Sequence, residues 1–305
     1  MTTPVIATPE EATLDARPRV ERTAGGRPRW ISRLPLHAVL ILVTLIWMLP
    51  TVSLLVNSFR PESDVLTTGW WNAFQLPFEF TLQNYQDVLS QENMGRSFIN
   101  SLMIAIPATV IPIMVAAYAA YAFAWMNFPG RNALFILVVG LLVVPLQSAL
   151  IPVLQLTTGL QLTGSFAAVW LAHTGFGLPF AIFLLRNFFG QLPKEMFESA
   201  YLDGASPTTA FFRLVLPLSV PAIASLVIFQ FMFVWNDLLV ALILVGGTPD
   251  VAPITVSIAN LIQSRGQGWH LLTAAAFISM ILPLIVFFSL QRYFVRGILG
   301  GSVKG

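Results

Sequence analysis

The sequence predicts an all-α protein that crosses a membrane several times. Of its 305 residues, 56% are hydrophobic and only 10% are charged. A soluble domain carries about 25% charged residues, so this chain lacks the polar side chains needed to cover a water-facing surface. Six apolar stretches are each long enough to span a bilayer, which takes about 20 helical residues. Backbone groups in lipid must be paired within their own segment, which requires helices.

The predicted spans are separated by more polar connecting segments of different lengths. The first predicted span is expected to cross the membrane rather than to be a cleaved signal peptide. Its apolar run is longer than the apolar core of a signal peptide, which has about 7–15 residues, and no small-residue cleavage site follows. The six spans run over Leu36–Val56, Phe98–Trp125, Ala133–Leu156, Phe166–Leu185, Leu218–Val245 and Leu271–Gln291.

Lysine and arginine are distributed unevenly between the connecting segments. With the N-terminus inside, 13 of the 16 basic residues fall in inside segments, and only Arg60, Arg96 and Arg265 lie outside. Positive residues are enriched on the cytoplasmic side of membrane proteins. The asymmetry predicts a multi-pass protein of the cell membrane with both termini in the cytoplasm.

Three regions are expected along the chain. Residues 1–30 have no apolar period and predict a disordered cytoplasmic tail, whose basic end is a topology signal or a contact for anionic membrane lipid. Residues 31–97 hold the first span and an outside loop, whose aromatic residues indicate an interfacial belt or, alternatively, a contact with an external partner. Residues 98–305 are expected to form the core domain with five spans.

The connecting segment 186–217 is too long for a simple turn and predicts two short helices. Residues 194–203 are good helix formers, and Gly204 can adopt the left-handed conformation that ends a helix. Ser206 and Pro207 then supply an N-cap and a first-turn residue for a second helix that enters the fifth span.

The first of these short helices is amphipathic. Met196, Phe197, Ala200 and Tyr201 share one face, and the acidic side chains point elsewhere. Such a helix can lie on lipid or dock into a groove of another protein. It lacks the lysine- and arginine-rich face of a lipid-binding helix, which favours a protein partner.

This segment resembles the EAA loop of the permease subunits of ABC importers. The run Glu198-Ser199-Ala200 is followed after three residues by Gly204 and after nine more by Leu214-Val215-Leu216-Pro217. The family pattern is EAA, three residues, G, nine residues and I-x-L-P, from which Ser199 and Leu214 depart conservatively. Further segments resemble the carbohydrate-uptake branch, and within it the maltose-type subunit: Asn57–Arg60, Phe98–Ser101, Trp235–Asp237 and Gly301–Gly305.

The resemblance implies the type I importer permease fold of ABC transporters. The chain would form, with a second homologous permease, the translocation path for a sugar or sugar-like solute. A cytoplasmic ABC ATPase dimer would receive the EAA helix, and an extracytoplasmic solute-binding protein would deliver the solute to the last outside loop, Gly246–His270. A mono- or oligosaccharide such as an α-glucoside, a polyol and a glycerol phosphodiester are all compatible. The expected ATPase-coupling residues are Met196, Phe197, Glu198, Ser199, Ala200, Asp203, Gly204 and Pro217.

The sequence carries no phosphate-binding motif of the G-x-x-x-x-G-K-[ST] type, so any ATP that drives transport must bind another chain. The chain is therefore not expected to be an enzyme or to hold a cofactor, and ATP and Mg would bind the partner ATPase. His37, His173 and His270 are far apart in the sequence, and no metal site is predicted. The net charge of +2 is small and the arginines flank the spans, so no nucleic-acid partner is predicted.

Four polar residues are candidates for the translocation path or gate: Asn236, Asp237, Gln147 and Gln230. Asp237 is the only acidic residue within a predicted span, where a carboxylate costs about 2.5–3.5 kcal/mol. An interhelical hydrogen bond or a contact with a wet cavity would offset this cost. A role in the gate or the solute path is the alternative.

Two other classes of function are alternatives to the importer. A secondary transporter or channel usually carries ionisable relays or paired broken helices in the membrane. One acidic residue and no lysine or arginine within the predicted spans argue against a proton relay. An integral membrane enzyme would need a cluster of catalytic residues at one face, which the sequence does not show.

Overall fold

The computed structural model describes residues 33–90, 93–246, 248, 250–265 and 268–302, and all regular secondary structure within these ranges is helical. This confirms the prediction of an all-α protein. The chain divides into two units, Met1–Val52 and Ser53–Gly305. The tail predicted at residues 1–30 lies outside the described residues.

The first predicted span is confirmed as helix α2, Leu34–Ser58. Its most apolar window has a mean hydropathy of 2.5, and 0% of that window is buried. Large apolar side chains along a helix of this length are suited to contact with lipid or with another membrane subunit.

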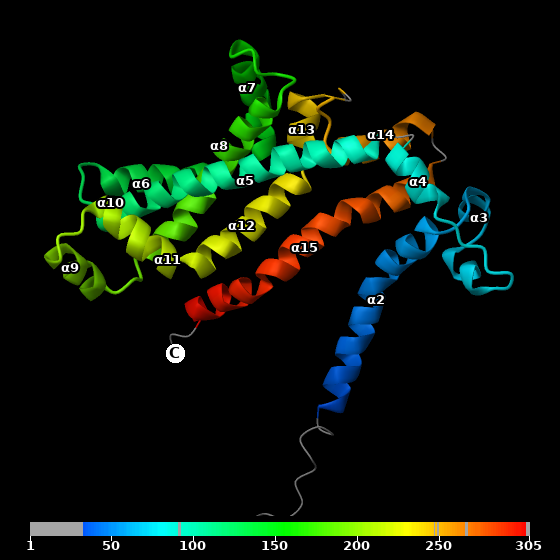
Figure 1. Ribbon diagram of the computed structural model, residues 1–305, viewed down its shortest axis with the longest axis horizontal. Coiled ribbons are helices and arrows are strands. Elements are labelled where there is room, and N and C mark those ends of the chain that lie inside the picture. The colour runs from blue at the N-terminus through cyan, green and yellow to red at the C-terminus, as the bar shows by residue number, and fades with distance from the viewer. Residues whose placement is uncertain (1–32, 91–92, 247, 249, 266–267, 303–305) are drawn as a thin grey trace, which may run out of the picture. The chain divides into compact units, whose positions relative to one another are not determined.

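Three further helices are long and apolar enough to cross a membrane, and they confirm the second, fourth and sixth predicted spans. Helix α8 packs most extensively on α5, and α15 is linked to both through α12, as Figure 1 shows. The bounds of these helices are Met94–Trp125 for α5, Phe166–Phe189 for α8, Val220–Trp235 for α12 and Trp269–Ser302 for α15.

The third predicted span, Ala133–Leu156, is present as two helical parts bent against each other rather than as one straight helix. Helix α6 (Arg131–Gly140) and the 3-10 turn η3 (Leu141–Val143) meet α7 (Leu146–Gly159) at an angle of 105°. Pro145 causes the break, because proline pushes the preceding residue into an extended conformation. Val144 accordingly has ψ 118°.

The fifth predicted span, Leu218–Val245, is also interrupted. Helix α12 ends at Trp235, and a separate helix α13 runs over Leu239–Leu244. Asn236 and Asp237 favour such an interruption because their side chains compete for backbone hydrogen bonds. On the other side, the segment that leads into α12 meets it at 74°. That segment comprises α10 (Pro207–Ala210), the π-helical turn η4 (Phe211–Val215) and α11 (Leu216–Leu218).

The connecting segments hold further short helices, of which α9 confirms the helix predicted over residues 194–203. The EAA-like segment begins with α9, and the last outside loop contains α14. These helices are α3 (Glu62–Thr67), η2 (Trp70–Phe74), α4 (Gln83–Ser90), α9 (Lys194–Leu202) and α14 (Ile254–Arg265).

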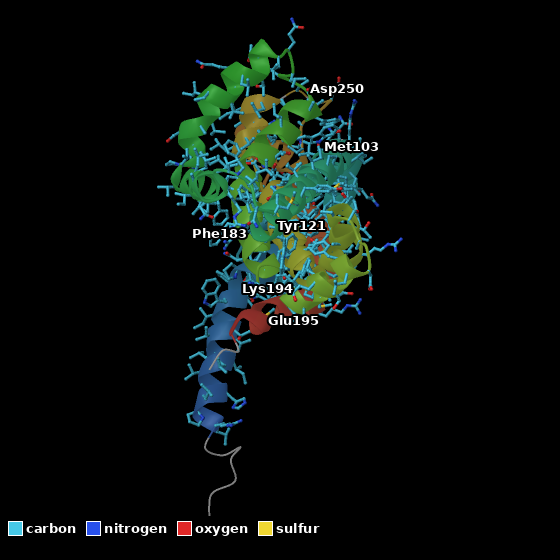
Figure 2. The ribbon with its side chains drawn as sticks, turned by 90° about the vertical axis from the view of Figure 1, so that its left-hand side faces the viewer. Met103, Tyr121, Phe183, Lys194, Glu195 and Asp250 are labelled. Carbon is cyan, nitrogen blue, oxygen red and sulfur yellow. The ribbon has the colours of Figure 1, made fainter. Side chains whose placement is uncertain are left out.

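Buried apolar side chains form two clusters that follow one another along α5, α8 and α12. One cluster lies at the end that carries α13 and α14 and includes Trp235 and Leu244. The other lies at the end that carries α9 and includes Leu185 and Phe197. Figure 1 shows α9 and α13 near opposite ends of these helices. In Figure 2 the first residues of α9 are likewise well separated from Asp250, which precedes α14.

Candidate functional site

The first candidate site is the segment around α9, and its end has the geometry that the sequence predicts. Gly204 has φ +80°, in the left-handed region. Its N–H donates to the Tyr201 carbonyl at 3.0 Å, and the Ala205 N–H donates to the Ala200 carbonyl at 2.9 Å. This pair of bonds is a Schellman motif, which satisfies the last carbonyl groups of a helix. The predicted role of Gly204 in ending the helix is therefore confirmed.

The second short helix begins as predicted. The Ser206 Oγ accepts a hydrogen bond from the Thr209 N–H at 3.2 Å, and Pro207 occupies the first turn of α10. An N-cap serine satisfies an N–H that otherwise has no partner in the helix. The chain therefore turns sharply between α9 and α10 with its backbone hydrogen bonds largely made.

Helix α9 is attached to the core through one aromatic side chain. Phe197 is only 2% exposed and stacks on Trp125 at the end of α5, with ring centroids 3.7 Å apart. The Trp125 Nε1–H donates to the Phe189 carbonyl at 3.0 Å, which fixes the indole against the end of α8. The stacking therefore joins α9 to the ends of both α5 and α8.

A tyrosine pair supports the same attachment. The Tyr121 hydroxyl of α5 donates to the Pro207 carbonyl at 3.0 Å and lies 3.4 Å from the Tyr201 hydroxyl of α9. Tyr121 and Trp125 were not among the predicted site residues. Their helical spacing of four places both on the same face of α5, but nothing in the sequence links that face to α9.

The remaining predicted coupling residues lie on or near the surface of this segment. Phe197 alone of the predicted apolar face is buried, and Met196 and Tyr201 are 37% and 43% exposed. Leu202, which the sequence analysis did not single out, is 89% exposed. Among the described residues Glu198 makes no ion pair. The exposed coupling residues are Met196, Glu198, Ser199, Asp203, Gly204 and Pro217, and Ala200 is half-buried.

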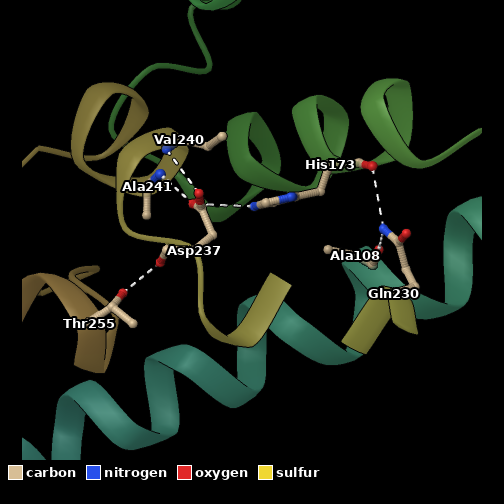
Figure 3. Close-up of polar contacts among 7 residues, drawn as sticks. All are labelled: Ala108, His173, Gln230, Asp237, Val240, Ala241 and Thr255. Atoms are coloured by element: carbon tan, nitrogen blue, oxygen red, sulfur yellow. Dashed lines mark hydrogen bonds and ion pairs between the residues drawn. The ribbon is translucent and has the colours of Figure 1, made fainter. Parts of the chain in front are cut away.

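The second candidate site is the interruption between α12 and α13, shown in Figure 3. The Asp237 carboxylate accepts hydrogen bonds from the N–H groups of Val240 at 3.2 Å and Ala241 at 3.0 Å. These N–H groups belong to the first turn of α13 and have no partner within that helix. Asp237 thus lies outside both helices and stabilises the start of the second. The prediction that Asp237 lies within a continuous helical span is wrong.

His173 of α8 faces the same carboxylate. Its ring is 0% exposed, and its Nε2 lies 3.5 Å from the Asp237 Oδ2. Neither ring nitrogen makes a hydrogen bond within the described residues. A cavity of about 10 Å³ borders both side chains and Ser101, which is close to the smallest volume that holds one water molecule.

Gln230 extends this polar cluster along α12. Its Nε2 donates to the Ala108 carbonyl of α5 at 3.2 Å and to the His173 carbonyl of α8 at 3.5 Å. The structure therefore joins two of the predicted path residues, Gln230 and Asp237, through His173 (Figure 3). A polar residue that binds carbonyls of two neighbouring helices fixes their relative position in the membrane.

The other two path candidates do not join the cluster. Asn236 is exposed and donates from its Nδ2 back to the Met232 carbonyl of its own helix at 2.8 Å. Gln147 is exposed near the start of α7. Neither side chain has a role in holding the core together.

The segment that precedes α14 is fixed to α5 by side chains. The Asn100 Nδ2 donates to the carbonyls of Asp250 and Ala252, each at 3.1 Å. The Ser101 Oγ accepts from the Ile254 N–H at 2.8 Å. Asn100 and Ser101 thus hold the chain that leads from the α13 end of the bundle into α14.

A larger groove of about 510 Å³ opens between the bent third span, α8 and α12. Its lining is apolar and contains no charged side chain. A sugar site needs hydrogen-bonding groups at fixed positions, so this groove is not suited to a sugar. Its lining residues are Leu141, Leu142, Val144, Leu146, Ala149, Val153, Leu156, Leu171, Ala172, Gly175, Phe176, Pro179 and Phe233.

Comparison with solved structures supports the fold. The chain superposes on a chain from the crystal structure of a bacterial ABC transporter involved in the import of the acidic polysaccharide alginate, with a TM-score of 0.77. The match covers 88% of this chain and 99% of the other at 20% sequence identity. A second match, to an alginate ABC transporter in complex with a pentasaccharide-bound periplasmic protein, has a TM-score of 0.63.

Comparison with other sequences identifies the family. An osmoprotective compounds uptake permease protein of Synechocystis sp. is 61% identical over 90% of this chain and 93% of its own length. An alpha-glucoside transport system permease protein of Rhizobium meliloti is 57% identical over 75% of this chain and 62% of its own length. The family profile described as the binding-protein-dependent transport system inner membrane component matches residues 112–300. The chain therefore belongs to this family, as an inner-membrane permease component of a binding-protein-dependent ABC importer.

Proposed function

We propose that this chain forms the translocation path together with a second, homologous permease subunit, and that α9 is its contact with a cytoplasmic ABC ATPase dimer. The attachment of α9 supports the proposal. Phe197, on the buried side of α9, stacks on Trp125 of the core. Glu198 and Ser199 lie on the exposed side of the same helix. A force applied to that exposed surface would reach the ends of α5 and α8 directly.

The exposed residues around α9 have separate roles in this proposal. Met196 and Leu202 supply apolar contacts to a groove of the ATPase, and the Glu198 and Asp203 carboxylates pair with basic groups there. Gly204 sets the angle between α9 and α10, and Pro217 lies directly before the 74° bend into α12. The ATPase, rather than this chain, binds ATP and Mg.

We propose that the solute is a neutral α-glucoside that serves as an osmoprotectant or carbon source. The names of two relatives, an osmoprotective compounds uptake permease and an alpha-glucoside transport permease, support this class. Gln147 and Asn236 are the proposed path residues, because both amides are exposed. The apolar groove would receive side chains of the second permease.

The proposed orientation places α9 and both termini in the cytoplasm and α13 and α14 outside. The distribution of basic residues supports it. In this orientation the binding protein docks near residues 246–270, where Asn100 and Ser101 hold the chain in place.

Cross-linking in the assembled transporter tests these contacts. The chain has no cysteine, so Ser199→Cys on α9 and Thr248→Cys before α14 each introduce a unique exposed thiol. We expect Ser199→Cys to cross-link to the ATPase and Thr248→Cys to the binding protein. Cross-linking of Ser199→Cys to the binding protein, or to no partner, would contradict the coupling role of α9.

Uptake by reconstituted transporter tests the solute. Proteoliposomes would contain this chain, its second permease and the ATPase, with the binding protein and radiolabelled solute outside. We expect ATP-dependent uptake of an α-glucoside, with little competition from a β-glucoside. ATP-dependent uptake restricted to a solute without a sugar ring would reject the α-glucoside while keeping the importer.

A further inference from the structure

A strip of exposed apolar side chains lies on the connection between α3 and α4, outside the spans and away from both candidate sites. Within residues 69–82 the only charged residue is Glu79. The exposed members are Trp71 at 62%, Phe74 at 60%, Leu76 at 81%, Phe78 at 57%, Phe80 at 53% and Leu82 at 62%. We call these six residues the apolar strip.

Hydrogen bonds tie this connection to the end of the first span. The Thr81 N–H donates to the Phe59 carbonyl at 2.7 Å. The Asn84 Nδ2 donates to the carbonyls of Ser58 and Arg60, each at 2.9 Å. Ser58 is the last residue of α2. The apolar strip therefore begins at the level where a membrane-spanning helix leaves the bilayer.

A buried arginine makes this attachment rigid. Arg60 is only 2% exposed, and its guanidinium donates to the Asn57 Oδ1 at 3.1 Å, to the Asp64 carbonyl at 3.2 Å and to the Thr68 hydroxyl. A buried arginine with several partners holds its surroundings in one arrangement. The position of the connection beside the end of α2 is thus determined by the fold.

The strip is also internally ordered. Trp70 contacts both Trp71 and Phe74 edge to face, with ring centroids 6.2 Å and 6.5 Å apart. A Cβ atom at Gly69 would lie 2.4 Å from the Trp71 ring, so a larger residue there would displace the indole. The aromatic rings are therefore presented outward by their own packing.

We propose that the apolar strip lies in the interface between the lipid headgroups and the acyl chains, as an anchor parallel to the membrane surface. Tryptophan and other aromatic side chains are favoured at this depth. A soluble binding protein that docked only transiently would leave the strip in water, where large apolar patches are unfavourable. Lipid is present throughout the cycle.

The backbone of the strip limits its depth. Within the described residues, the N–H groups of Leu76, Phe78, Glu79 and Phe80 make no backbone hydrogen bond, and Pro77 has no N–H. Unpaired backbone groups are not tolerated in the hydrocarbon core, whereas headgroups and water satisfy them. With Glu79 as the only charge in residues 69–82, this segment has no electrostatic attraction to anionic lipid. Binding is therefore expected to be independent of lipid charge.

Fluorescence quenching in the complete transporter tests this proposal. Because the native chain lacks cysteine, Phe78→Cys and, in a second variant, Phe80→Cys would each carry one environment-sensitive label, with the complex held in uncharged phosphatidylcholine nanodiscs. Gln86→Cys on α4 is the matched exposed control. We expect lipids brominated on their acyl chains to reduce emission from the labels on the strip at least about twofold and to leave the control unchanged.

The other possible occupants give different results. A second permease that covers the strip would shield both labels from brominated lipid, and a docking site for the binding protein would make their emission respond to that protein. Either result would overturn the proposal. Equal quenching in phosphatidylcholine and in anionic lipid is expected, whereas quenching that requires anionic lipid would contradict an uncharged anchor. The readout is independent of solute and of ATP, so it can fail while the proposed transport function holds.

Discussion

Buried apolar side chains pack at both ends of the core helices, and the two ends differ in the contacts that are added to this packing. At the α9 end, stacked and tilted aromatic rings attach the short helix, with Phe197 on Trp125 at the centre. At the α13 end, a buried histidine and a carboxylate lie beside a helix interruption. Apolar packing is lost only by separating the surfaces, whereas polar partners at an interruption can be exchanged for water or for one another. The comparison indicates that the attachment of α9 to the core is fixed and that the attachment of α13 is adjustable. These two attachments are called the fixed joint and the adjustable joint.

The same three helices pass through both regions. Helices α5, α8 and α12 each contribute residues to both hydrophobic clusters. Helix α8 is the most direct connection, because it carries His173 near its middle and leads through a short turn into α9. The following changes test the contrast between the two joints, in order of decreasing expected effect.

Phe197→Ala should have the largest effect, because it removes the buried ring that attaches α9. Truncating a buried phenylalanine costs about 3–5 kcal/mol, and here the loss falls on a nine-residue helix. We expect solute uptake to fall more than about tenfold, with the ATPase recovered less efficiently with the purified permease. Uptake and subunit recovery would be measured on the same membranes.

The matched control for this variant is Leu202→Ala on the same helix. Leu202 is 89% exposed, so its truncation should leave the attachment of α9 and the thermal stability of the isolated permease unchanged. If Leu202→Ala lost ATPase binding but kept normal stability, the exposed side of α9 would be identified as the contact with the ATPase. Equal stability of Phe197→Ala and the native chain would contradict the fixed joint.

Gly204→Val should have the next largest effect. The residue has φ +80°, and an added Cβ would meet nothing within 4 Å, so only the backbone conformation is penalised. Holding a β-branched residue in the left-handed region costs about 1–3 kcal/mol. We expect normal insertion into the membrane but ATP hydrolysis that no longer drives uptake.

Gly164→Val provides the same strain at a different place. Its φ is +82° and its Cβ position is also open, but it lies between α7 and α8, away from α9. The two variants should destabilise the protein to a similar degree, and only Gly204→Val should separate hydrolysis from transport. Uncoupling by both would show that strain alone is responsible.

The adjustable joint is tested by a double-mutant cycle between His173→Gln and Asp237→Asn. The asparagine keeps one of the two oxygens that accept from the Val240 and Ala241 N–H groups, so the start of α13 remains partly capped. Direct contacts between two side chains give coupling energies of about 0.5–3 kcal/mol. We expect non-additive effects on thermal stability in detergent, with less loss of ATPase binding than for Phe197→Ala. Strict additivity would show that the 3.5 Å contact contributes nothing.

At the α9 end, the sequence predicted where the short helices end and begin but not which side chains attach α9 to the core, for physical reasons. Gly204 and the Ser206–Pro207 pair determine local backbone conformation, so their roles follow from residue type and spacing alone. The partners Trp125 and Tyr121 are about 70 to 80 residues away from α9 in the chain, and only the folded structure brings them together.

The sequence does not show which positions break the third and fifth spans, for a related reason. An apolar run in the sequence shows that a segment is long enough to span the membrane, but not whether its helix bends on the way. Pro145 and Asn236-Asp237 carried local signals for the interruptions, but similar signals do not end every helix here. Helix α5 continues through both Pro107 and Pro112, and α8 continues through Pro179. Packing against neighbouring helices decides which of these positions becomes a break.

Gly177→Ala should have the smallest effect and tests how closely α8 and α12 approach at the polar cluster. A Cβ at this position would lie 2.6 Å from the Gln230 Oε1, so the amide must move. Its bonds to the Ala108 and His173 carbonyls would then weaken, at a net cost of about 1 kcal/mol. The expected result is a slightly lower Tm in detergent, with uptake reduced less than in any variant above.

The sign of the effect should reverse once Gln230 is shortened. In a Gln230→Ala background the added Cβ has room, and alanine is preferred over glycine inside a helix by about 0.5–1 kcal/mol. Gly177→Ala should therefore raise the Tm of Gln230→Ala although it lowers that of the native chain. If both backgrounds respond with the same sign, the glycine does not serve to accommodate Gln230. A reversal would show that position 177 needs glycine because the Gln230 side chain occupies the space beside it.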